Sequence, residues 1–280
     1  MPEPRIDLHA HTSFSDGTFT PEESLALAAE RGVTTLGITD HDTTDGLERA
    51  AAAAASHGIE LVPGVEFSAM YEGSSIHVLC YWMDPAHPAF QEELVRLRED
   101  RFRRGERMVE KLQALGYPIT FDRVREISGG GNIVRPHIAQ ALLEAGVVAT
   151  EKDAYTQDLI ADGGKADVPK HALHPLDALD LIRSAGGVCV IAHPGMWGDQ
   201  QETPDVLIEQ MADRGMAGLE ADHPDHSPEQ RERYREMARS LGLVATGASD
   251  DHGTRYDPVR LGTVTTEPEA FAALRERRPA

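Results

Sequence analysis

Nine residues whose side chains commonly bind metal ions recur along this 280-residue chain. All are histidines or carboxylates, and they stand at His9, His11, Asp16, His41, Glu66, His77, His193, Asp250 and His252. Neutral imidazoles and carboxylates are the usual ligands of Zn²⁺, Mn²⁺ and Fe²⁺. Nine ligands exceed the needs of one ion, whereas three or four protein ligands per ion suit a cluster. The pattern therefore predicts two or three divalent metal ions that activate water.

The spacing of the first pair supports this prediction. His9 and His11 form an H-x-H pair at the end of an apolar run, and strand side chains alternate with period two, so both imidazoles project to the same side. A single histidine at a strand end is more often structural or exposed than a ligand. Six of the 13 histidines belong to the set, however, together with three carboxylates. The joint pattern, rather than any one residue, favours a metal site.

Short apolar runs alternate with helical patterns along both flanks of the chain, which predicts strands joined by helical crossovers in a parallel sheet or barrel. Strands are expected at 6–9, 35–39, 60–65, 76–82, 188–192, 217–221 and 243–247. Most of the nine residues then lie at or beyond the C-terminal end of a strand, where the βα loops of barrels build active sites. His77 is the exception, because it lies near the start of a run. A hairpin over 66–82 that turns near Gly73 would bring His77 back to Glu66.

The alternation breaks between about residues 88 and 173. This stretch holds a long helix at about 88–115, a run of three glycines from Gly129 and a helix that starts near Pro136. Because no strong strand pattern occurs there, we expect a helical subdomain inserted over one mouth of the barrel. The predicted division is a first barrel part at 1–95, a helical insertion at 96–173 that recognises substrate phosphate, and a second barrel part at 174–280.

Taken together, the motifs resemble the PHP (polymerase and histidinol phosphatase) family. They are I-D-L-H-A-H-T at 6–12, S-D-G at 15–17, I-T-D-H-D at 38–42, G-V-E at 64–66, A-H-P at 192–194 and S-D-D-H-G at 249–253. The resemblance covers about 5–95 and 175–265 and implies an α/β fold, a distorted seven-stranded (β/α) barrel with an inserted helical subdomain.

The same resemblance implies how the ligands are shared among three ions. His9, His11, Glu66 and Asp250 would hold the first ion. Glu66 would bridge to a second ion held by His77 and His193, and a third would be held by Asp16, His41 and His252. Glu66, Asp250 and His193 are the predicted catalytic residues.

Within the family, the insertion is similar to the TrpH-like branch, which includes nucleoside 3′,5′-bisphosphate phosphatases and a 5′→3′ exoribonuclease of the RNase AM type. The matching segment, 132–139, also favours anion binding on its own chemistry. With Pro136 in the first turn, free backbone N–H groups and the helix dipole favour phosphate. Arg135 adds a planar fork and His137 a further donor. Alternatively, Arg135 and His137 only cap a surface helix. His223, after a predicted strand, is another candidate for phosphate contact or a residue that lines its loop.

Other basic residues give weaker patterns. The arginine-rich stretch 96–107 suits an RNA track, but Glu99–Arg103 and Asp100–Arg104 are i,i+4 pairs, which favours a solvated helix face. Three further residues are candidates for the pocket, although no spacing requires it: Lys165, Lys170 and His171.

Composition narrows the partners. The formal net charge of −20 opposes binding of long duplex nucleic acid. A small phosphorylated ligand stays compatible, because bound divalent cations make the site locally positive. No run approaches the roughly 20 apolar residues of a membrane span, and the first residues lack signal-peptide features, so we expect a cytoplasmic protein. Cys80 and Cys189 lie in apolar runs and are expected to be buried, reduced thiols.

The predicted function is metal-dependent hydrolysis of the 3′-phosphate of nucleoside 3′,5′-bisphosphates, and of short 5′-phosphorylated oligoribonucleotides 5′→3′, by attack of a metal-activated hydroxide on phosphorus. Mn²⁺ is the expected metal, with Fe²⁺ and Zn²⁺ as alternatives, since all three accept N and O ligands. The pattern fits both mononucleotides and oligonucleotides.

Three other functions are compatible with parts of the pattern. A histidinol-phosphate-type or other small-molecule phosphatase would not need the second phosphate grip at Arg135. A non-catalytic, metal-stabilised PHP module is disfavoured because all nine ligand positions are filled. Hydrolysis of a C–N bond by an amidohydrolase-type site shares the H-x-H start of the barrel, but usually needs a carboxylated lysine or another ligand order.

Overall fold

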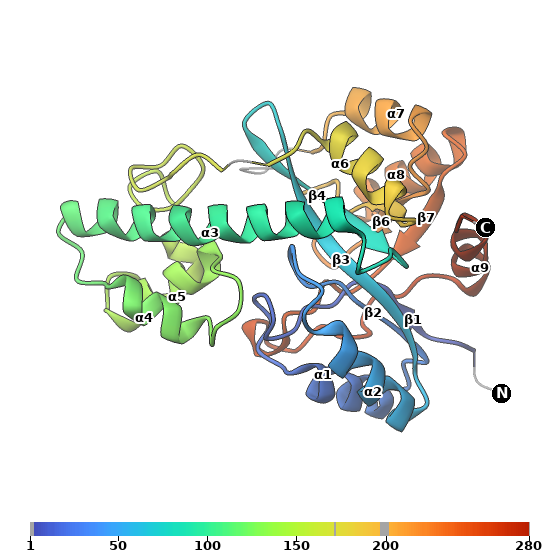
Figure 1. The fold of residues 1–280 in the computed structure, drawn as a ribbon, viewed down its shortest axis with the longest axis horizontal. Coiled ribbons are helices and arrows are strands. Elements are labelled where there is room, and N and C mark those ends of the chain that lie inside the picture. Colours follow the sequence, from blue (N-terminus) through green and yellow to red (C-terminus); the bar gives the residue numbers. More distant parts are fainter. Residues whose placement is uncertain (1–2, 171, 197–201, 280) are drawn as a thin grey trace.

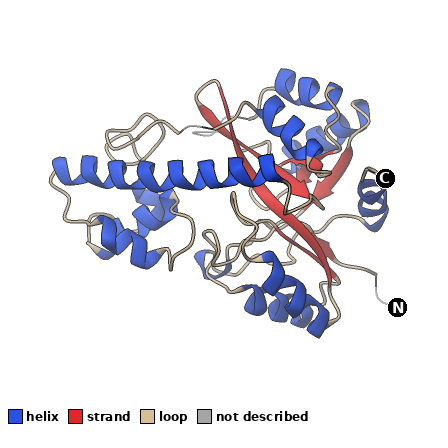
Figure 2. Cartoon of the chain, in the orientation of Figure 1, coloured by secondary structure: helices blue, strands red, loops and turns tan. Residues whose placement is uncertain are grey.

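The computed structural model describes residues 3–170, 172–196 and 202–279, so His171 lies outside the described residues. Over those ranges, seven strands form one sheet in sequence order (Figures 1 and 2). The strands are β1 (Ile6–Asp7), β2 (Thr35–Ile38), β3 (Glu60–Tyr71), β4 (Ser74–Tyr81), β5 (Val188–Ile191), β6 (Gly218–Asp222) and β7 (Val244–Gly247). Each predicted strand is present, although β1 is shorter and β3 much longer than expected.

The sheet is mixed rather than parallel, because β3 and β4 form the hairpin expected over 66–82. β1, β2 and β3 are parallel to one another, as are β5, β6 and β7, whereas β4 runs antiparallel to both of its neighbours. β3 continues six residues beyond its predicted end and turns back through Glu72 and Gly73, both of which have positive φ. An antiparallel partner needs only this tight turn and no crossover helix.

The chain beyond β7 returns to β1 and nearly closes the sheet into a barrel. Isolated bridges join Ile6 to Thr266 and Ala10 to Asp251. Buried Asp7 strengthens this seam, because its carboxylate accepts the backbone N–H groups of Ser249 at 3.0 Å and Gly262 at 2.7 Å. The distorted seven-stranded α/β barrel predicted from the sequence is therefore confirmed.

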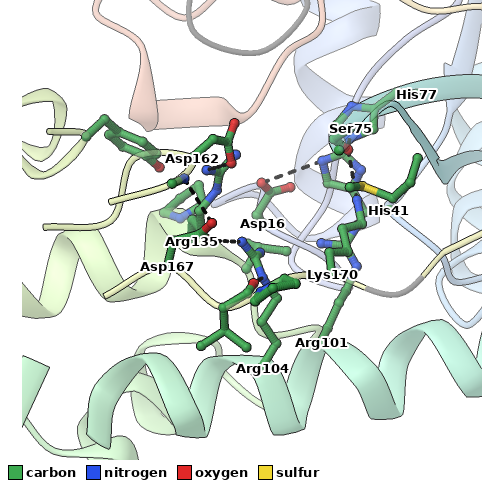
Figure 3. A pocket seen from close by; sticks show the side chains of 18 residues that line it. Asp16, His41, Ser75, His77, Arg101, Arg104, Arg135, Asp162, Asp167 and Lys170 are labelled. Carbon is green, nitrogen blue, oxygen red and sulfur yellow. Dashed lines mark hydrogen bonds and ion pairs between the residues drawn. The ribbon is translucent and has the colours of Figure 1, made fainter. Parts of the chain in front are cut away.

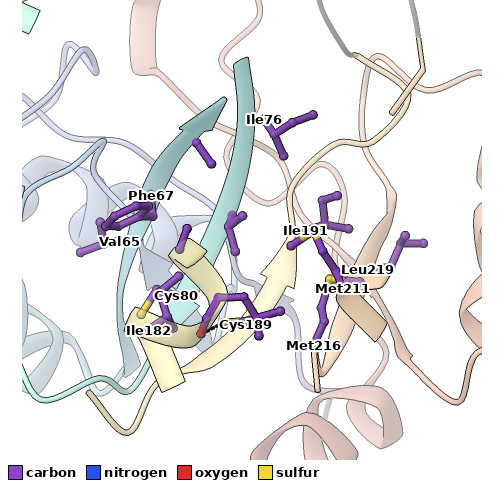
Figure 4. Close-up of a cluster of buried hydrophobic side chains, with 14 of the residues drawn as sticks. Val65, Phe67, Ile76, Cys80, Ile182, Cys189, Ile191, Met211, Met216 and Leu219 are labelled. Atoms are coloured by element: carbon purple, nitrogen blue, oxygen red, sulfur yellow. Dashed lines mark hydrogen bonds between the residues drawn. The ribbon is translucent and has the colours of Figure 1, made fainter. Parts of the chain in front are cut away.

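Helices cover the outside of the barrel. They are α1 (Pro21–Glu30), α2 (Leu47–His57), α6 (Pro175–Ser184), α7 (Asp205–Asp213), α8 (Pro228–Ser240) and α9 (Pro268–Glu276). A capping box begins α1, where the backbone N–H of Thr20 donates to Glu23 Oε2 at 2.8 Å. Between the sheet and α6 to α8 lies an apolar cluster that contains Cys80 and Cys189 (Figure 4). The two residues are opposite each other on β4 and β5, and both are buried free thiols.

The insertion consists of α3 (Pro88–Ala114), α4 (Phe121–Ile127), α5 (Arg135–Glu144) and the short 3₁₀ helix η1 (Glu151–Ala154). It has an apolar cluster of its own. The 27-residue α3 contributes to two clusters, because Phe90 and Leu94 pack against the barrel whereas Met108 and Leu112 pack within the insertion. Figure 1 shows α3 running from the barrel out to α4 and α5. The predicted boundary between residues 95 and 96 falls inside this continuous helix.

None of the helices within the described ranges is long and apolar enough to span a bilayer.

Candidate metal centre

The alternation of strand side chains sends carboxylates into the barrel. Val65 and Phe67 of β3 pack in the cluster under the helices, so Glu66 between them faces the interior. Leu219 and Ala221 of β6 pack in the same cluster, so Glu220 between them also faces the interior. The interior is thus apolar at one end and acidic where the ligand-bearing loops emerge.

All nine predicted ligands converge at this end of the barrel. Three groups of their donor atoms lie close enough to hold an ion: His9, His11, Glu66 and Asp250; His11, Asp16, His41 and His252; and His41, Glu66 and His77. His193 joins the last group, since its Nε2 lies 3.0 Å from Glu66 Oε1. The hairpin of β3 and β4 accounts for His77, as expected, because it places His77 Nδ1 2.8 Å from the same oxygen.

Glu66 lies at the centre of the cluster. Its Oε1 faces His77 and His193, whereas its Oε2 lies 3.0–3.3 Å from ring nitrogens of three other histidines: His9, His11 and His41. Only 1% of Glu66 is exposed. Its two oxygens therefore address two separate sets of imidazoles, as a bridging ligand must.

The first group has the dimensions of a single coordination sphere. His9 Nε2 and His11 Nε2 are 3.0 Å apart, and they lie 3.2 and 3.3 Å from Asp250 Oδ1. Tetrahedral ligands at about 2.0–2.1 Å from a metal ion are separated by roughly 3.3 Å. The four donor atoms of this group therefore need little movement to share one ion.

Several of these donor atoms lack hydrogen-bond partners. Within the described residues, Asp16 Oδ1, His41 Nδ1, Glu66 Oε2 and Asp250 Oδ1 are buried and make no hydrogen bond, although His41 Nδ1 and Glu66 Oε2 are only 3.0 Å apart. Burying an unpaired carboxylate oxygen is costly, and a cation at these points would remove that cost. The residues present therefore fit divalent metal ions.

The carboxylates of the cluster are held in the ionised form. Burial opposes ionisation of Glu66, yet the neighbouring His41 and His77 hold its pKa well below the usual range. Asp250 behaves in the same way, because burial is outweighed by His9 and His252 and the pKa is well below its ordinary value. Ionised carboxylates are the form that binds metal ions.

Backbone strain is concentrated at the same place. His193 has φ of 25° and Asp250 has φ of 48°, in the left-handed region that side-chain-bearing residues seldom occupy. Such strain persists where the surrounding structure fixes it and is frequent at active sites. Asp16 depends on a tight turn, because a Cβ at Gly17 would lie only 2.4 Å from the carbonyl oxygen of His11.

Sequence reasoning missed Glu220. Its Oε1 accepts a hydrogen bond from His9 Nδ1 at 3.1 Å, and its Oε2 accepts one from the backbone N–H of His193 at 2.8 Å. The signal available in the sequence was one acidic residue inside the apolar run 217–221. Asp40 was also missed. It accepts from the backbone N–H of Thr12 and the hydroxyl of Ser15, both at 2.7 Å, and so fixes the loop that follows β1.

A cavity of about 650 Å³ separates the metal centre from the insertion (Figure 3). At one end it is lined by three members of the metal cluster: Asp16, His41 and His77. Four basic residues of the insertion also line it: Arg101, Arg104, Arg135 and Lys170. An acidic chain thus presents a localised cationic surface beside its carboxylate-rich centre.

The basic residues are held by neighbours that also line the cavity. Arg135 Nη1 donates to Asp162 Oδ1 at 2.6 Å, and its guanidinium lies 5.9 Å from the ring centre of Tyr155. Lys170 Nζ donates to Ser75 Oγ at 2.9 Å. Burial, with Arg101 nearby, lowers the pKa of Lys170 to about 7. Lys165, by contrast, is exposed and pairs with an aspartate on the surface.

The arginine-rich stretch divides between two faces of α3. Arg103 pairs with Glu99 on the solvent face, as expected. Arg101 and Arg104 lie three residues apart on the inner face and reach the cavity, where Arg104 Nη2 donates to Asp167 Oδ1 at 3.0 Å. The i,i+3 spacing of Arg101 and Arg104 indicates that both lie on one face of the helix. The i,i+4 charge pairs nevertheless favoured a solvated face for the whole stretch.

His137 and His223 lie in different surroundings from Arg135. His137 is buried, and its Nδ1 accepts the backbone N–H of Val134 at 3.3 Å, so it shapes the start of α5. Burial lowers its pKa to about 4. His223 is buried beside the metal cluster, with its Nε2 3.3 Å from Asp250 Oδ2. Phosphate binding by either residue stays a prediction.

Relatives of known activity share most of the chain. Residues 7–126 match the PHP domain. The chain is 35% identical over 248 residues to the 5′-3′ exoribonuclease Rnm of Salmonella typhimurium, and the alignment covers 88% of this chain and 84% of that protein. It is 36% identical over 249 residues to the 3′,5′-nucleoside bisphosphate phosphatase of Chromobacterium violaceum, which covers 88% and 87%.

The fold agrees with these relatives. A protein of Bifidobacterium adolescentis assigned as a metal-dependent phosphoesterase superposes with a TM-score of 0.91 at 35% identity, over 100% of this chain and 98% of that one. The superposition covers the barrel and the insertion alike. The chain therefore belongs to the PHP family and is a metal-dependent phosphoesterase.

Proposed function

We propose that this phosphoesterase removes the 3′-phosphate of nucleoside 3′,5′-bisphosphates and also cleaves short 5′-phosphorylated oligoribonucleotides from the 5′ end. The observation that carries the proposal is the cavity that joins the metal cluster to the cationic surface of the insertion. A substrate with two phosphates separated by a ribose has one group for each end. The activities for which the two relatives are named, on a nucleoside bisphosphate and on RNA, support the same substrate class.

The nine clustered residues are the proposed ligands of two or three divalent ions, with Glu66 shared between two of them. Mn²⁺ is the proposed metal, with Fe²⁺ and Zn²⁺ as alternatives that the same donors accept. Divalent ions bound there would lower the pKa of water and neutralise the phosphoryl and leaving-group oxygens. Glu66, Asp250 and His193 are the proposed catalytic residues, because they surround the point where the two sets of ligands meet.

The insertion is proposed to hold the phosphate that does not react. Arg135 is oriented by Asp162 through Nη1, which leaves its other N–H groups to bind phosphate oxygens. Arg104 and Lys170 would complete the grip. Binding energy from this remote phosphate then positions the reacting phosphate, which raises turnover rather than affinity alone. The cavity thus separates recognition on the insertion from chemistry on the barrel.

His137 and His223 are proposed to act through neighbours. His137 accepts the Val134 N–H and so helps to set the first turn of α5, from which Arg135 projects. The Nδ1 of His223 accepts the backbone N–H of Asp225, so its proton is on Nε2, which donates to Asp250. That contact would fix the carboxylate of Asp250. A direct contact of His223 with the reacting phosphate is a separate prediction.

The same geometry accommodates an oligoribonucleotide. Its 5′-phosphate would occupy the cationic end, which puts the first internucleotide linkage at the metal cluster. Cleavage of the bond to the 3′ oxygen releases one nucleoside 5′-phosphate and leaves a new 5′-phosphate on the remaining strand. Each product strand is therefore a substrate again, which gives 5′→3′ directionality.

The test is a comparison of kcat/KM with added Mn²⁺ for adenosine 3′,5′-bisphosphate, 3′-AMP, 5′-AMP and histidinol phosphate. A tri-ribonucleotide with and without a 5′-phosphate extends the series. We expect the bisphosphate to exceed each monoester by about 10- to 150-fold, the value of one charge-assisted phosphate contact. The product should be 5′-AMP. A monoester that equals the bisphosphate would show that the second phosphate is not recognised.

A further inference from the structure

Glu220 is a fully buried carboxylate that contacts two of the proposed metal ligands without belonging to their groups. Its Oε1 lies 3.1 Å from the ring Nδ1 of His9, and its Oε2 accepts the backbone N–H of His193 at 2.8 Å. Both Glu220 and His9 are completely inaccessible to solvent. One side chain therefore joins the loop after β1 to the loop after β5.

The contact with His9 sets the tautomer of that ring. His9 Nε2 points to Glu66 Oε2 and Asp250 Oδ1, so this nitrogen must present its lone pair to bind a cation. Its proton then lies on Nδ1, which donates a hydrogen bond to Glu220 Oε1. A carboxylate in this position orients an imidazole and raises its basicity as a ligand.

The contact with His193 acts on the backbone. His193 has φ of 25°, which an L-residue rarely adopts, and this conformation directs its Nε2 to Glu66 Oε1. The Glu220 carboxylate accepts this N–H in a hydrogen bond that helps to hold the strained residue.

We propose that Glu220 is a positioning residue that couples the two ion sites sharing Glu66. It fixes His9, which belongs with Glu66 Oε2, and His193, which belongs with Glu66 Oε1. This inference rests on the ligand assignment of the proposed function, but not on the identity of the substrate. Loss of the Glu220 carboxylate should then weaken the binding of both ions together. Loss of a contact to only one ligand should weaken the binding of one ion.

The variant Glu220→Gln tests the idea because an amide cannot serve both partners. If its oxygen accepts from His9, its NH₂ group faces the N–H of His193, and two donors oppose each other. If the amide is reversed, its NH₂ group faces His9 Nδ1 and favours the tautomer that blocks Nε2. The first orientation therefore leaves buried donors unpaired, and the second opposes metal binding at His9 Nε2.

Ser15→Ala is the matched control. Ser15 Oγ donates to Asp40 Oδ1 at 2.7 Å, so it accepts at 3.3 Å from Nδ1 of His11. It therefore supports one imidazole in the way that Glu220 supports His9, but it has no contact with the His193 loop among the described residues. The group of Asp16, His41 and His252 serves as an internal reference for the Glu220 variant.

The experiment measures retained metal without any substrate. Metal-free protein is equilibrated with a series of buffered free Mn²⁺ concentrations, and elemental analysis counts the equivalents bound. For Glu220→Gln we expect two equivalents to weaken, each by about 10- to 100-fold. For Ser15→Ala we expect the equivalent that His77 and His193 help to hold to be unchanged. Weakening of a single equivalent in Glu220→Gln, or of none, would overturn the coupling.

Folding is controlled by circular dichroism and thermal unfolding of the metal-free proteins. If Glu220→Gln does not fold, Glu220→Asp is used, because its shorter carboxylate keeps the charge but reaches only one partner. That variant should weaken one equivalent, and wild-type retention of all equivalents would overturn the proposal. If the wild-type protein binds its metal ions but does not hydrolyse the bisphosphate, the proposed substrate is rejected and the coupling by Glu220 is not.

Discussion

Arg101 on α3 donates its Nε–H at 2.6 Å to Oδ2 of Asp42, which is next in sequence to the proposed ligand His41. The same guanidinium donates from Nη2 to Ser68 Oγ on β3 at 2.5 Å. Asp42 is completely buried and has φ of 50°. The ion pair therefore connects the cationic end of the cavity directly to the loop that presents His41.

Removing this arginine should destabilise the whole protein. Arg101→Met leaves the Asp42 carboxylate buried without its cation, which costs about 3–5 kcal/mol. Arg103→Met, on the solvent face of the same helix, should cost less than about 1 kcal/mol. Chemical denaturation of the two variants measures the difference. Equal stabilities would mean that Asp42 finds another partner or loses its charge.

Glu66→Gln should have a larger effect on turnover and on metal content than Asp16→Asn. Glu66 faces both sets of imidazoles, whereas the Asp16 carboxylate faces the group that contains His252, at 3.3 Å. We expect two equivalents of metal to be weakened in the first variant and one in the second. Elemental analysis at fixed free Mn²⁺ provides the measurement. Full occupancy in Glu66→Gln would exclude a shared carboxylate.

Arg135→Ala should separate substrates by their number of phosphates. Loss of one charge-assisted contact is worth about 1.5–3 kcal/mol, or roughly 10- to 150-fold in kcat/KM for adenosine 3′,5′-bisphosphate. A simple monoester should change little. Steady-state kinetics on both substrates, with Arg103→Ala as the surface control, gives the comparison. Equal losses would assign Arg135 to the catalytic centre or to the fold.

Recognition of the second phosphate should weaken as pH rises. Burial lowers the pKa of Lys170 from 10.5 to about 7, so this cation is protonated below that pH and neutral above it. The KM for the bisphosphate is then expected to increase between pH 7 and pH 9, by up to about 10-fold. A monoester should not show the increase. Lys170→Arg stays charged, so its KM for the bisphosphate should not change over this pH range. The same increase in KM as in the wild type would show that Lys170 is not responsible.

Removal of metal should lower thermal stability. Asp16, Glu66 and Asp250 keep buried oxygens that have no hydrogen-bond partner within the described chain, and a bound cation stabilises only the folded state. One ion at 100 times its Kd contributes about 2.7 kcal/mol, which is at least about 5 °C in Tm for a chain of this size. Calorimetry with chelator, and with chelator presaturated by Mn²⁺, measures the shift. An unchanged Tm would argue against resident ions.

The sequence was sufficient to predict features that depend on local pattern. The strands β2, β5, β6 and β7 follow from apolar runs bounded by turns, and H-x-H at the end of β1 follows from strand alternation. The convergence of the nine residues was predictable because parallel strands point their C-terminal ends to one rim. Local periodicity, however, does not reveal the direction of a neighbouring strand, so the antiparallel direction of β4 could be expected only from the turn near Gly73.

Residues that act through tertiary contacts were harder to recognise. Glu220 contacts His9, which is 211 residues away in sequence, and Asp40 contacts Thr12 and Ser15, which are 28 and 25 residues away. No sequence motif records such pairs. Arg101 and Arg104 were assigned to a solvated face because nearby acids formed plausible i,i+4 pairs. Only the packing of α3 against the barrel decides which side of that helix meets the cavity.

The tip of the long hairpin of β3 and β4 forms part of the cavity wall at a distance from Glu66. It contributes Met70, Gly73 and Ser75 to the wall of the cavity, whereas Glu66 and His77 lie nearer the barrel. Lengthening both arms by two residues preserves the inward direction of each side chain and extends the wall by about 3.3 Å per residue. Homologous chains can thus diverge in the length of ligand they admit while every metal-facing group stays in register, which makes this hairpin the natural place to engineer new selectivity.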